Sequence, residues 1–226
     1  MFPHDAAQAG QPRASRRGQA SWLTYRYDAT AWYWGSFLHD VSYGRAYRKL
    51  FQRLGIQGWG GGAVPRVLDC GIGAGVFCEA FIRTLGAPTR LYGFDLSPRL
   101  LSRAAKRLTG RGARPHLVRA DVRALPIRDG AVELVLSALV LDHVREPATA
   151  LAELARVARP GALVVVVTTR PFAPDLPIRL AFRYWRHDPA AIERAMAAVG
   201  LCDVHRHPLT GLARPFGIAF TARARV

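Results

Sequence analysis

A glycine-rich turn that directly follows an apolar run is the segment of this chain best suited to chemistry. Residues 67–77 read Val-Leu-Asp-Cys-Gly-Ile-Gly-Ala-Gly-Val-Phe, a buried strand that runs into a turn and then a helix. Gly71 and Gly73 allow a tight turn and the close approach of a ligand, and Gly75 lets the helix pack near the strand. The dinucleotide pattern G-x-G-x-x-G needs glycine where the chain has Val76. The segment therefore predicts a ligand site and disfavours a nicotinamide dinucleotide.

Three aspartates stand at successive strand ends. Asp69 lies inside the glycine motif, where a carboxylate can organise the loop, accept hydrogen bonds from a cationic amino-acid group, and repel a pyrophosphate. Asp95 ends the second predicted strand, where it can accept both ribose hydroxyls of an adenosine. Asp121 follows the third predicted strand, from which it could accept the adenine amino group. Together the three carboxylates favour a ligand that joins an adenosine to an amino acid.

The elements that position these residues alternate between strands and helices. The expected strands are 66–70, 91–95, 116–119, 132–137 and 163–168, and the expected helices are 75–85, 98–108 and 148–158. The four consecutive valines at 164–167 are typical of a central parallel strand that is buried on both faces. A helix at 189–199 and two strands at 202–205 and 216–222 follow. This alternation predicts an α/β fold with a doubly wound sheet.

These segments resemble the successive motifs of class I S-adenosylmethionine-dependent methyltransferases, and more narrowly the type 11 branch that contains ubiquinone and menaquinone methyltransferases. The resemblance rests on residues 69–75, Asp95, Asp121 and 133–141, and it extends over roughly 64–170. It implies a Rossmann-like, mostly parallel seven-stranded sheet with helices on both faces and an N-terminal helical cap. It also implies S-adenosyl-L-methionine as cofactor, S-adenosyl-L-homocysteine as product, and no metal.

The resemblance implies roles for the residues that match the motifs. Asp69, Gly71 and Gly73 border the methionine moiety, Asp95 takes the ribose, and Asp121 flanks the adenine together with Val122. Ser137 and Ala138 line the methyl-transfer pocket. The full expected cofactor-binding set is Tyr27, Asp69, Gly71, Gly73, Asp95, Leu96, Asp121, Val122 and Ser137. The pair Tyr27-Asp28 matches the family, but Trp34-Gly35 replaces its second Tyr-Asp pair, which leaves the role of the cap open.

A general base is needed only if the acceptor is protonated at the working pH. His143, which follows Asp142 after the fourth strand, is the first candidate, and a packed structural histidine is the alternative for the same residue. Tyr25, Tyr33 and His39 are weaker candidates.

Composition divides the chain into three parts. Residues 1–20 are expected to form a flexible tail, 21–62 the helical cap, and 63–226 the Rossmann-like methyltransferase domain. Ten of the 22 aromatic residues fall in 22–51, so the cap must cover something, either the sheet alone or also a lipophilic acceptor. Within 171–188, apolar Ile178, Phe182 and Trp185 can share one helical face and Arg179, Arg183 and Arg186 another, as in a helix lying over the core or a lid at anionic lipid.

The formal charge of +16 would suit an anionic partner, but 30 of the 32 basic residues are arginine and they are spread along the chain, which favours a compositional bias. Three cysteines without a C-x-x-C pair indicate neither disulfides nor zinc and favour a reducing cytoplasm. No apolar run is long enough to span a bilayer, so at most peripheral contact with an anionic membrane is expected.

Four functions follow from these patterns. The first is methyl transfer to a small lipophilic or aromatic acceptor, such as a quinone, a lipid or a secondary metabolite. The second is phospholipid N-methylation at a membrane surface. The third, RNA methylation, rests on charge alone, and 137–140 lacks the motif of amino-directed base methyltransferases. The fourth is a non-catalytic binding protein that keeps the fold. The sequence leaves the acceptor atom and the oligomeric state open.

Overall fold

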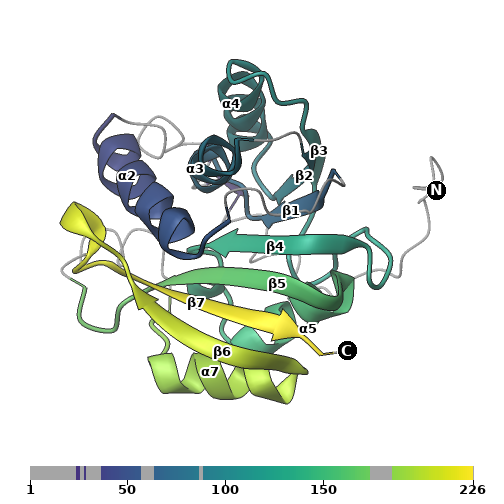
Figure 1. The fold of residues 1–226 in the computed structure, drawn as a ribbon, viewed down its shortest axis with the longest axis vertical. Coiled ribbons are helices and arrows are strands. Elements are labelled where there is room, and N and C mark those ends of the chain that lie inside the picture. Colours follow the sequence, from purple (N-terminus) through teal and green to yellow (C-terminus); the bar gives the residue numbers. More distant parts are fainter. Residues whose placement is uncertain are drawn as a thin grey trace.

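Seven strands form one sheet in the computed structural model of this chain (Figure 1). The structure describes residues 24, 25, 28, 37–56, 64–86, 89–173 and 185–225, with only the backbone at 37–41. The strands are β1 (Arg66–Cys70), β2 (Arg90–Asp95), β3 (His116–Arg119), β4 (Val132–Ala138), β5 (Ala158–Thr169), β6 (Leu201–Pro208) and β7 (Gly217–Ala224). Their order is β3-β2-β1-β4-β5-β7-β6. β1 to β5 pair in parallel, and β7 runs antiparallel to both of its neighbours. The predicted mostly parallel seven-stranded sheet is confirmed.

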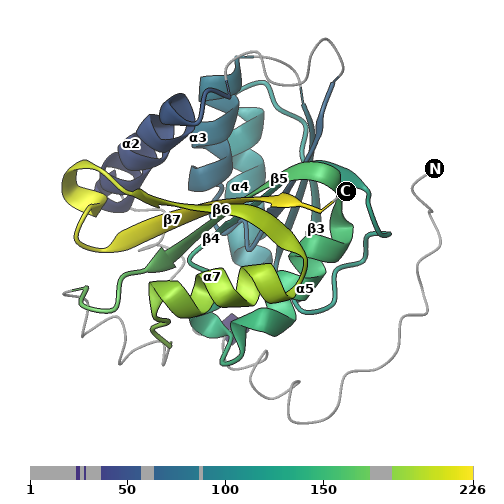
Figure 2. The same ribbon diagram turned by 60° about the horizontal axis from the view of Figure 1, so that its bottom comes forward.

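Helices cover both faces of this sheet, as Figure 2 shows. One face carries α2 (Phe37–Arg53), α3 (Val76–Leu85) and α4 (Pro98–Thr109), and the other carries α5 (Pro147–Val157) and α7 (Pro189–Ala198). Two short 3-10 helices, η1 (Leu141–His143) and η2 (Gly211–Ala213), follow β4 and β6. In the described part of the chain, no helix combines the length and the apolar character that a membrane span requires.

The run of valines in β5 explains how one sheet serves two cores. Successive side chains of a strand point to opposite faces. Val164 and Val166 accordingly belong to the core under α5 and α7, while Val165 and Val167 belong to the core under α2 and α3. All four are completely buried. A continuous apolar run is therefore required here, whereas an alternating one would leave a face polar.

β5 begins five residues earlier than the sequence indicates. Ala158 pairs with Val132, and a register shift between Val132 and Leu134 accommodates the intervening segment. Gly161 within this segment has a φ of 77°, a left-handed value that glycine adopts at little cost. The strand thus continues through the Pro-Gly pair as a bulge.

The expected tail and most of the expected lid cannot be compared with the structure. Residues 1–20 lie outside the described residues, as do 174–184, which include Ile178, Phe182, Arg179 and Arg183. At the described end of the lid, Trp185 donates its backbone N–H to the carbonyl of Asp142 at 2.7 Å. The chain that leaves the lid is thus fixed to the turn after β4.

Candidate active site

The turn after β1 has the backbone that its three glycines predicted. Gly71, Gly73 and Gly75 have φ values of 69°, 53° and 82°. A Cβ on Gly71 would lie 2.1 Å from Cγ2 of Val140, so the loop after β4 closes directly against this turn. A Cβ on Gly75 would instead meet Ala104 of α4 at 3.3 Å. Gly75 therefore permits contact between two helices, rather than the helix and strand contact that we expected.

Asp95 holds this turn in place. Its carboxylate accepts hydrogen bonds from the backbone N–H groups of Gly73 at 2.9 Å and Ser97 at 2.8 Å. Burial raises the pKa of Asp95 to about 6, against the lowering effect of these backbone donors. We expected Asp69 to organise the loop, but in the structure Asp95 makes that contact. Each carboxylate oxygen keeps a lone pair with which it could bind a ribose hydroxyl.

Asp69 is a buried carboxyl group that makes no protein contact of this kind. Its side chain is 1% exposed, and among the described residues neither oxygen has a hydrogen-bond partner. It points to the face that α2 and α3 cover, because Val67, two residues earlier on β1, belongs to that core. Burial, followed by the charge of Asp95, raises its pKa well above the ordinary value. The arrangement suits a ligand that brings a cationic hydrogen-bond donor.

Asp121 is already engaged by a neighbouring arginine. Nη2 of Arg123 lies 2.6 Å from Oδ2 of Asp121, and Nε of the same guanidinium lies 2.9 Å from Oδ1. The backbone N–H of Arg123 also donates to Oδ1 at 2.9 Å. This ion pair raises the pKa of Arg123. The carboxylate that we expected to accept the adenine amino group therefore shares its oxygens with a guanidinium, which the sequence did not lead us to expect.

The end of β4 carries a strained residue and a buried hydroxyl. Leu139 has a φ of 61°, which is unusual for a residue with a branched side chain. Ser137 is completely buried, and its Oγ has no hydrogen-bond partner among the described residues. Because side chains alternate along the strand, Ser137 and Ala138 point to opposite faces of the sheet. Ala138 packs on the core of α2 and α3, the face to which Asp69 points.

His143 lies in η1, between β4 and α5. Burial lowers its pKa to about 4, so the imidazole is neutral at neutral pH. The preceding Asp142 accepts hydrogen bonds from both the backbone N–H (3.0 Å) and the hydroxyl (2.6 Å) of Thr169, at the end of β5. This link between the ends of β4 and β5 fixes the backbone that carries His143.

Aromatic side chains of α2 reach the same edge. Tyr43, Tyr47 and Phe51 lie at helical spacing of four residues, and Tyr47 contacts Phe77 of α3 with ring centroids 4.6 Å apart. Burial, then Tyr43, and then the carboxyl groups of Asp69 and Asp142 raise the pKa of Tyr47. Tyr47 is therefore close to the buried carboxyl group. The sequence singled out the aromatic segment but not this residue, which its spacing of four from Tyr43 and Phe51 could have indicated.

Some expected residues lie elsewhere or outside the described part. Tyr27 and Tyr33 are outside it, as is the side chain of His39. Tyr25 is 70% exposed. Asp28 does reach the site's border, where it accepts a hydrogen bond from the hydroxyl of Ser97. The adjacent carbonyl of Leu96 accepts from Nε of Arg119 at 3.0 Å. Among the described residues, no group of histidines, cysteines and acids could hold a metal ion.

Comparison with known proteins finds matches to the segment that carries the glycine turn and the three aspartates. Residues 68–166 match the family described as "Methyltransferase domain". A malonyl-[acyl-carrier protein] O-methyltransferase of Halorhodospira halophila is 38% identical over 106 residues, which are 47% of this chain and 35% of that protein. The chain spans only 28 to 38% of the length of the first curated relatives that it matches.

Two further proteins match over more of the chain. A phosphatidylethanolamine N-methyltransferase of Cereibacter sphaeroides is 27% identical over 184 residues, or 76% of this chain and 87% of that protein. The crystal structure of magnesium protoporphyrin IX methyltransferase from Synechocystis PCC 6803 with bound SAH superposes with a TM-score of 0.71. It covers 92% of this chain and 100% of the other at 16% identity, so this likeness concerns the fold.

Proposed function

We propose that this chain, which carries a class I S-adenosylmethionine-dependent methyltransferase domain, moves a methyl group to a small lipophilic acceptor. The observation that carries this proposal is the carboxyl group of Asp69, buried and without a hydrogen-bond partner beside a glycine turn. Leaving such a group unpaired costs about 1–3 kcal/mol or more. An amino-acid ammonium group would supply the missing donors and charge. The site thus fits the methionine end of S-adenosylmethionine.

The other residues at this edge fit the remaining parts of the cofactor. We assign the methionine moiety to Asp69, Gly71 and Gly73, and the ribose to Asp95 with Leu96 beside it. The Cβ-free backbone at Gly71 keeps the turn closed against the loop after β4. S-adenosylmethionine supplies an electrophilic methyl group on a sulfonium centre, so the protein's task is to position the acceptor and exclude water.

The adenine subsite needs an adjustment of the ion pair described above. We assign adenine to Asp121 and Val122. Of the two residues expected at the methyl-transfer pocket, Ser137 points to the opposite face, so we assign the border of the pocket to Ala138, on the face of Asp69. Both oxygens of Asp121 contact Arg123 in this structure. The adenine amino group must therefore either share the carboxylate with the guanidinium or displace one of its hydrogen bonds. Each carboxylate oxygen can accept two hydrogen bonds, which permits sharing.

The acceptor side of the site is apolar and aromatic. Tyr47 and Phe77 are buried next to one another on the face of Asp69, and Tyr43 packs against Tyr47 with centroids 5.6 Å apart. Aromatic surroundings of this kind support a lipophilic or aromatic acceptor. His143 remains our candidate for accepting a proton or a hydrogen bond, because its imidazole is neutral at neutral pH. Tyr25 and His39 remain weaker candidates for the general base.

A second candidate is phospholipid N-methylation at a membrane surface. The relative named phosphatidylethanolamine N-methyltransferase is matched over 87% of its own length, against 35% for the malonyl-[acyl-carrier protein] O-methyltransferase. Two large apolar side chains also project at the edge where β5 ends: Phe172 is 96% exposed and Leu212 is 74% exposed. Arg170, two residues before Phe172, donates its backbone N–H to Phe216 at 2.8 Å, which joins the two loops. Exposed apolar groups flanked by arginines favour peripheral contact with anionic lipid.

A turnover screen tests the proposal. The protein would be given S-adenosylmethionine with a quinol, a phenol or vesicles containing phosphatidylethanolamine, and release of S-adenosylhomocysteine and product mass would be measured. We expect turnover with one acceptor class, and loss of turnover in Asp69→Asn but not in Asp203→Asn, a matched change at an exposed strand residue. Absence of S-adenosylmethionine binding in calorimetry contradicts the proposal.

The same screen separates the two candidates. The double variant Phe172→Ser, Leu212→Ser removes both exposed apolar groups and leaves the carboxylate edge intact. If the acceptor is a membrane phospholipid, this variant loses turnover with vesicles. If the acceptor is a soluble aromatic compound, its turnover is unchanged.

A further inference from the structure

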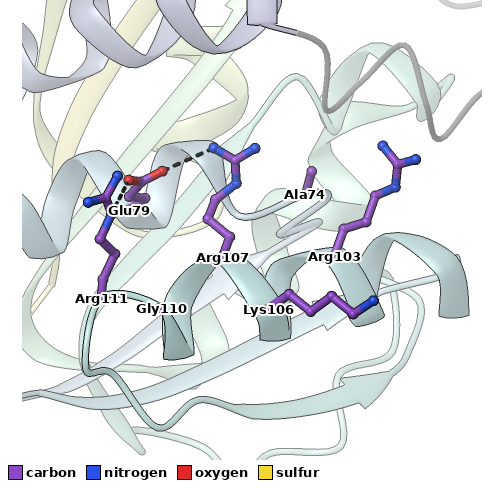
Figure 3. A pocket seen from close by; sticks show the side chains of 7 residues that line it. All are labelled: Ala74, Glu79, Arg103, Lys106, Arg107, Gly110 and Arg111. Atoms are coloured by element: carbon purple, nitrogen blue, oxygen red, sulfur yellow. Dashed lines mark hydrogen bonds and ion pairs between the residues drawn. The ribbon is translucent and has the colours of Figure 1, made fainter.

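A basic groove lies between α3 and α4, outside the site proposed for the cofactor (Figure 3). Its volume is about 520 Å³, within the range of pockets that hold small molecules. Four basic side chains line it, namely Arg103, Lys106, Arg107 and Arg111. Glu79 of α3 is the acidic residue among those that line it. We call this feature the basic groove.

The periodicity of α4 explains why the cations gather on one side. Leu100, Ala104 and Leu108 are buried at a spacing of four residues and hold the helix on the core. Arg103 and Arg107 repeat at the same spacing on the adjacent stripe, and Arg111 continues it in the turn after the helix. Figure 3 shows Arg107 and Arg111 directed toward Glu79 of α3, with Arg103 farther along α4. Like charges at this spacing repel one another.

Glu79 pairs with two of these cations. Its carboxylate lies 3.0 Å from Nη1 of Arg107 and 2.8 Å from Nε of Arg111, and its side chain is 12% exposed. Burial alone would raise the pKa of Glu79, but the hydrogen bonds from these two arginines outweigh it and hold the pKa below the ordinary value. Among the residues that line the groove, four cations thus accompany one acid.

One end of the groove reaches the glycine turn. Ala74, which lines the groove, stands between Gly73 and Gly75. Gly75 in turn is close to Ala104 of α4, as its missing Cβ permits. The groove therefore begins at the outer side of the turn and runs away from it between the two helices. The carboxylates of the proposed cofactor site lie at the sheet edge instead, so the two sites carry opposite charge.

We propose that the basic groove binds the phosphate group of a small phosphorylated ligand. Guanidinium groups bind phosphate oxygens in pairs, and an ammonium group adds a point charge, so a row of three arginines and one lysine suits a phosphate with several free oxygens. The groove's volume leaves room for the group that carries the phosphate. A soluble phosphate ester and a lipid headgroup share this chemistry. The inference is independent of the proposed methyl acceptor.

The test compares two variants that remove the same charge. Arg103→Gln, Lys106→Gln changes the groove and leaves the partners of Glu79 in place. Arg128→Gln, Arg194→Gln removes two exposed arginines, one in the loop before β4 and one on α7. Thermal unfolding would be followed against inorganic phosphate, with chloride adjusted to constant ionic strength. We expect saturable stabilisation of the wild type and the control variant, and roughly tenfold weaker phosphate affinity in the groove variant.

Two further measurements test whether the groove variant is folded and which kind of molecule carries the phosphate. S-adenosylhomocysteine binding, equal in all three proteins, shows that the groove variant is folded. Sedimentation with phosphatidylcholine vesicles, with and without phosphatidic acid, assigns the site to a lipid headgroup if the groove variant alone loses binding. If no protein sediments and phosphate still stabilises, the site takes a soluble ester. An equal response of both variants to phosphate, or no saturable response of the wild type, overturns the inference.

Discussion

The backbone N–H of Gly73 donates a hydrogen bond of 2.9 Å to the carboxylate of Asp95. Asp95 ends β2, while Gly73 lies in the turn after β1, and the two strands are parallel neighbours. The same carboxylate also accepts the N–H of Ser97. The residue assigned to the ribose thus shapes the turn assigned to the methionine moiety. A change at Asp95 is therefore expected to alter both the ribose subsite and the glycine turn.

Asp95→Ala should release the glycine turn as well as weaken cofactor binding. A hydrogen bond to a charged group contributes about 1.5–3 kcal/mol, so we expect at least roughly tenfold faster hydrogen exchange at the Gly73 amide. Affinity for S-adenosylhomocysteine should fall by at least about tenfold for the same reason. Exchange measured by NMR and binding measured by calorimetry check both effects. Asp203→Asn, at an exposed position whose left-handed φ of 52° asparagine tolerates, is the control, and unchanged exchange at Gly73 would contradict the prediction.

Asp69→Asn should stabilise the free protein while weakening cofactor binding. The raised pKa values of Asp69 and Asp95 mean that the folded protein holds protons more tightly than the unfolded chain. The two groups therefore contribute most to the free energy of unfolding at low pH, and this contribution is lost as the pH rises, for Asp95 through about 6. An amide at position 69 removes its part of this penalty, so the melting temperature should exceed that of the wild type more at pH 8 than at pH 5.

The same substitution removes the charge that we assign to the ligand's ammonium group. Affinity for S-adenosylhomocysteine at pH 8 should fall by about tenfold or more, since a charge-assisted hydrogen bond is lost. Scanning calorimetry at the two pH values and titration calorimetry provide the measurements. A lower melting temperature at pH 8, or unchanged affinity, would show that Asp69 is a structural residue.

His143→Gln distinguishes a catalytic histidine from a structural one. Because burial lowers the pKa of His143 to about 4, its neutral form stabilises the fold above about pH 6.5, and this contribution is lost as the pH falls toward 4. If His143 accepts the acceptor's proton, kcat should fall by about a hundredfold in the variant, and His143 should contribute no step to the wild-type kcat profile near pH 6.5. His205→Gln, at an exposed position of β6, is the control. Full kcat in His143→Gln would leave this residue only a packing role.

Gly71→Ala should be more damaging than the same change at another glycine with positive φ. Gly112 has a φ of 79° and open space around its missing Cβ, so Gly112→Ala isolates the backbone strain, about 1–2 kcal/mol. Gly71→Ala adds a contact of 2.1 Å with Val140, for which a further 1–3 kcal/mol or so is expected. The double variant with Val140→Ala should recover much of that difference in urea unfolding. Equal losses at the two glycines would contradict the close approach.

Local patterns were sufficient to predict the elements that carry the site. The strand that ends in the glycine turn and the strand that ends at Asp95 were both expected, because alternation of apolar runs and helical stretches depends on near neighbours in the chain. The ion pair between Asp121 and Arg123 was not expected. The two residues are only two positions apart, but the pair forms because the turn after β3 brings the guanidinium of Arg123 back onto the carboxylate of Asp121.

The sequence by itself determined the order of strands and helices, the turn with its three glycines, and the types of acid at the strand ends. Only the tertiary structure decided which acid holds the turn and which is left without a partner. Burial raises the pKa of Asp69, and the charge of Asp95, which ends the neighbouring strand β2, raises it further. The periodicity that predicts strands and helices depends on residues close together in the sequence. The burial and charge around a carboxyl group depend instead on which elements pack over it in the folded protein.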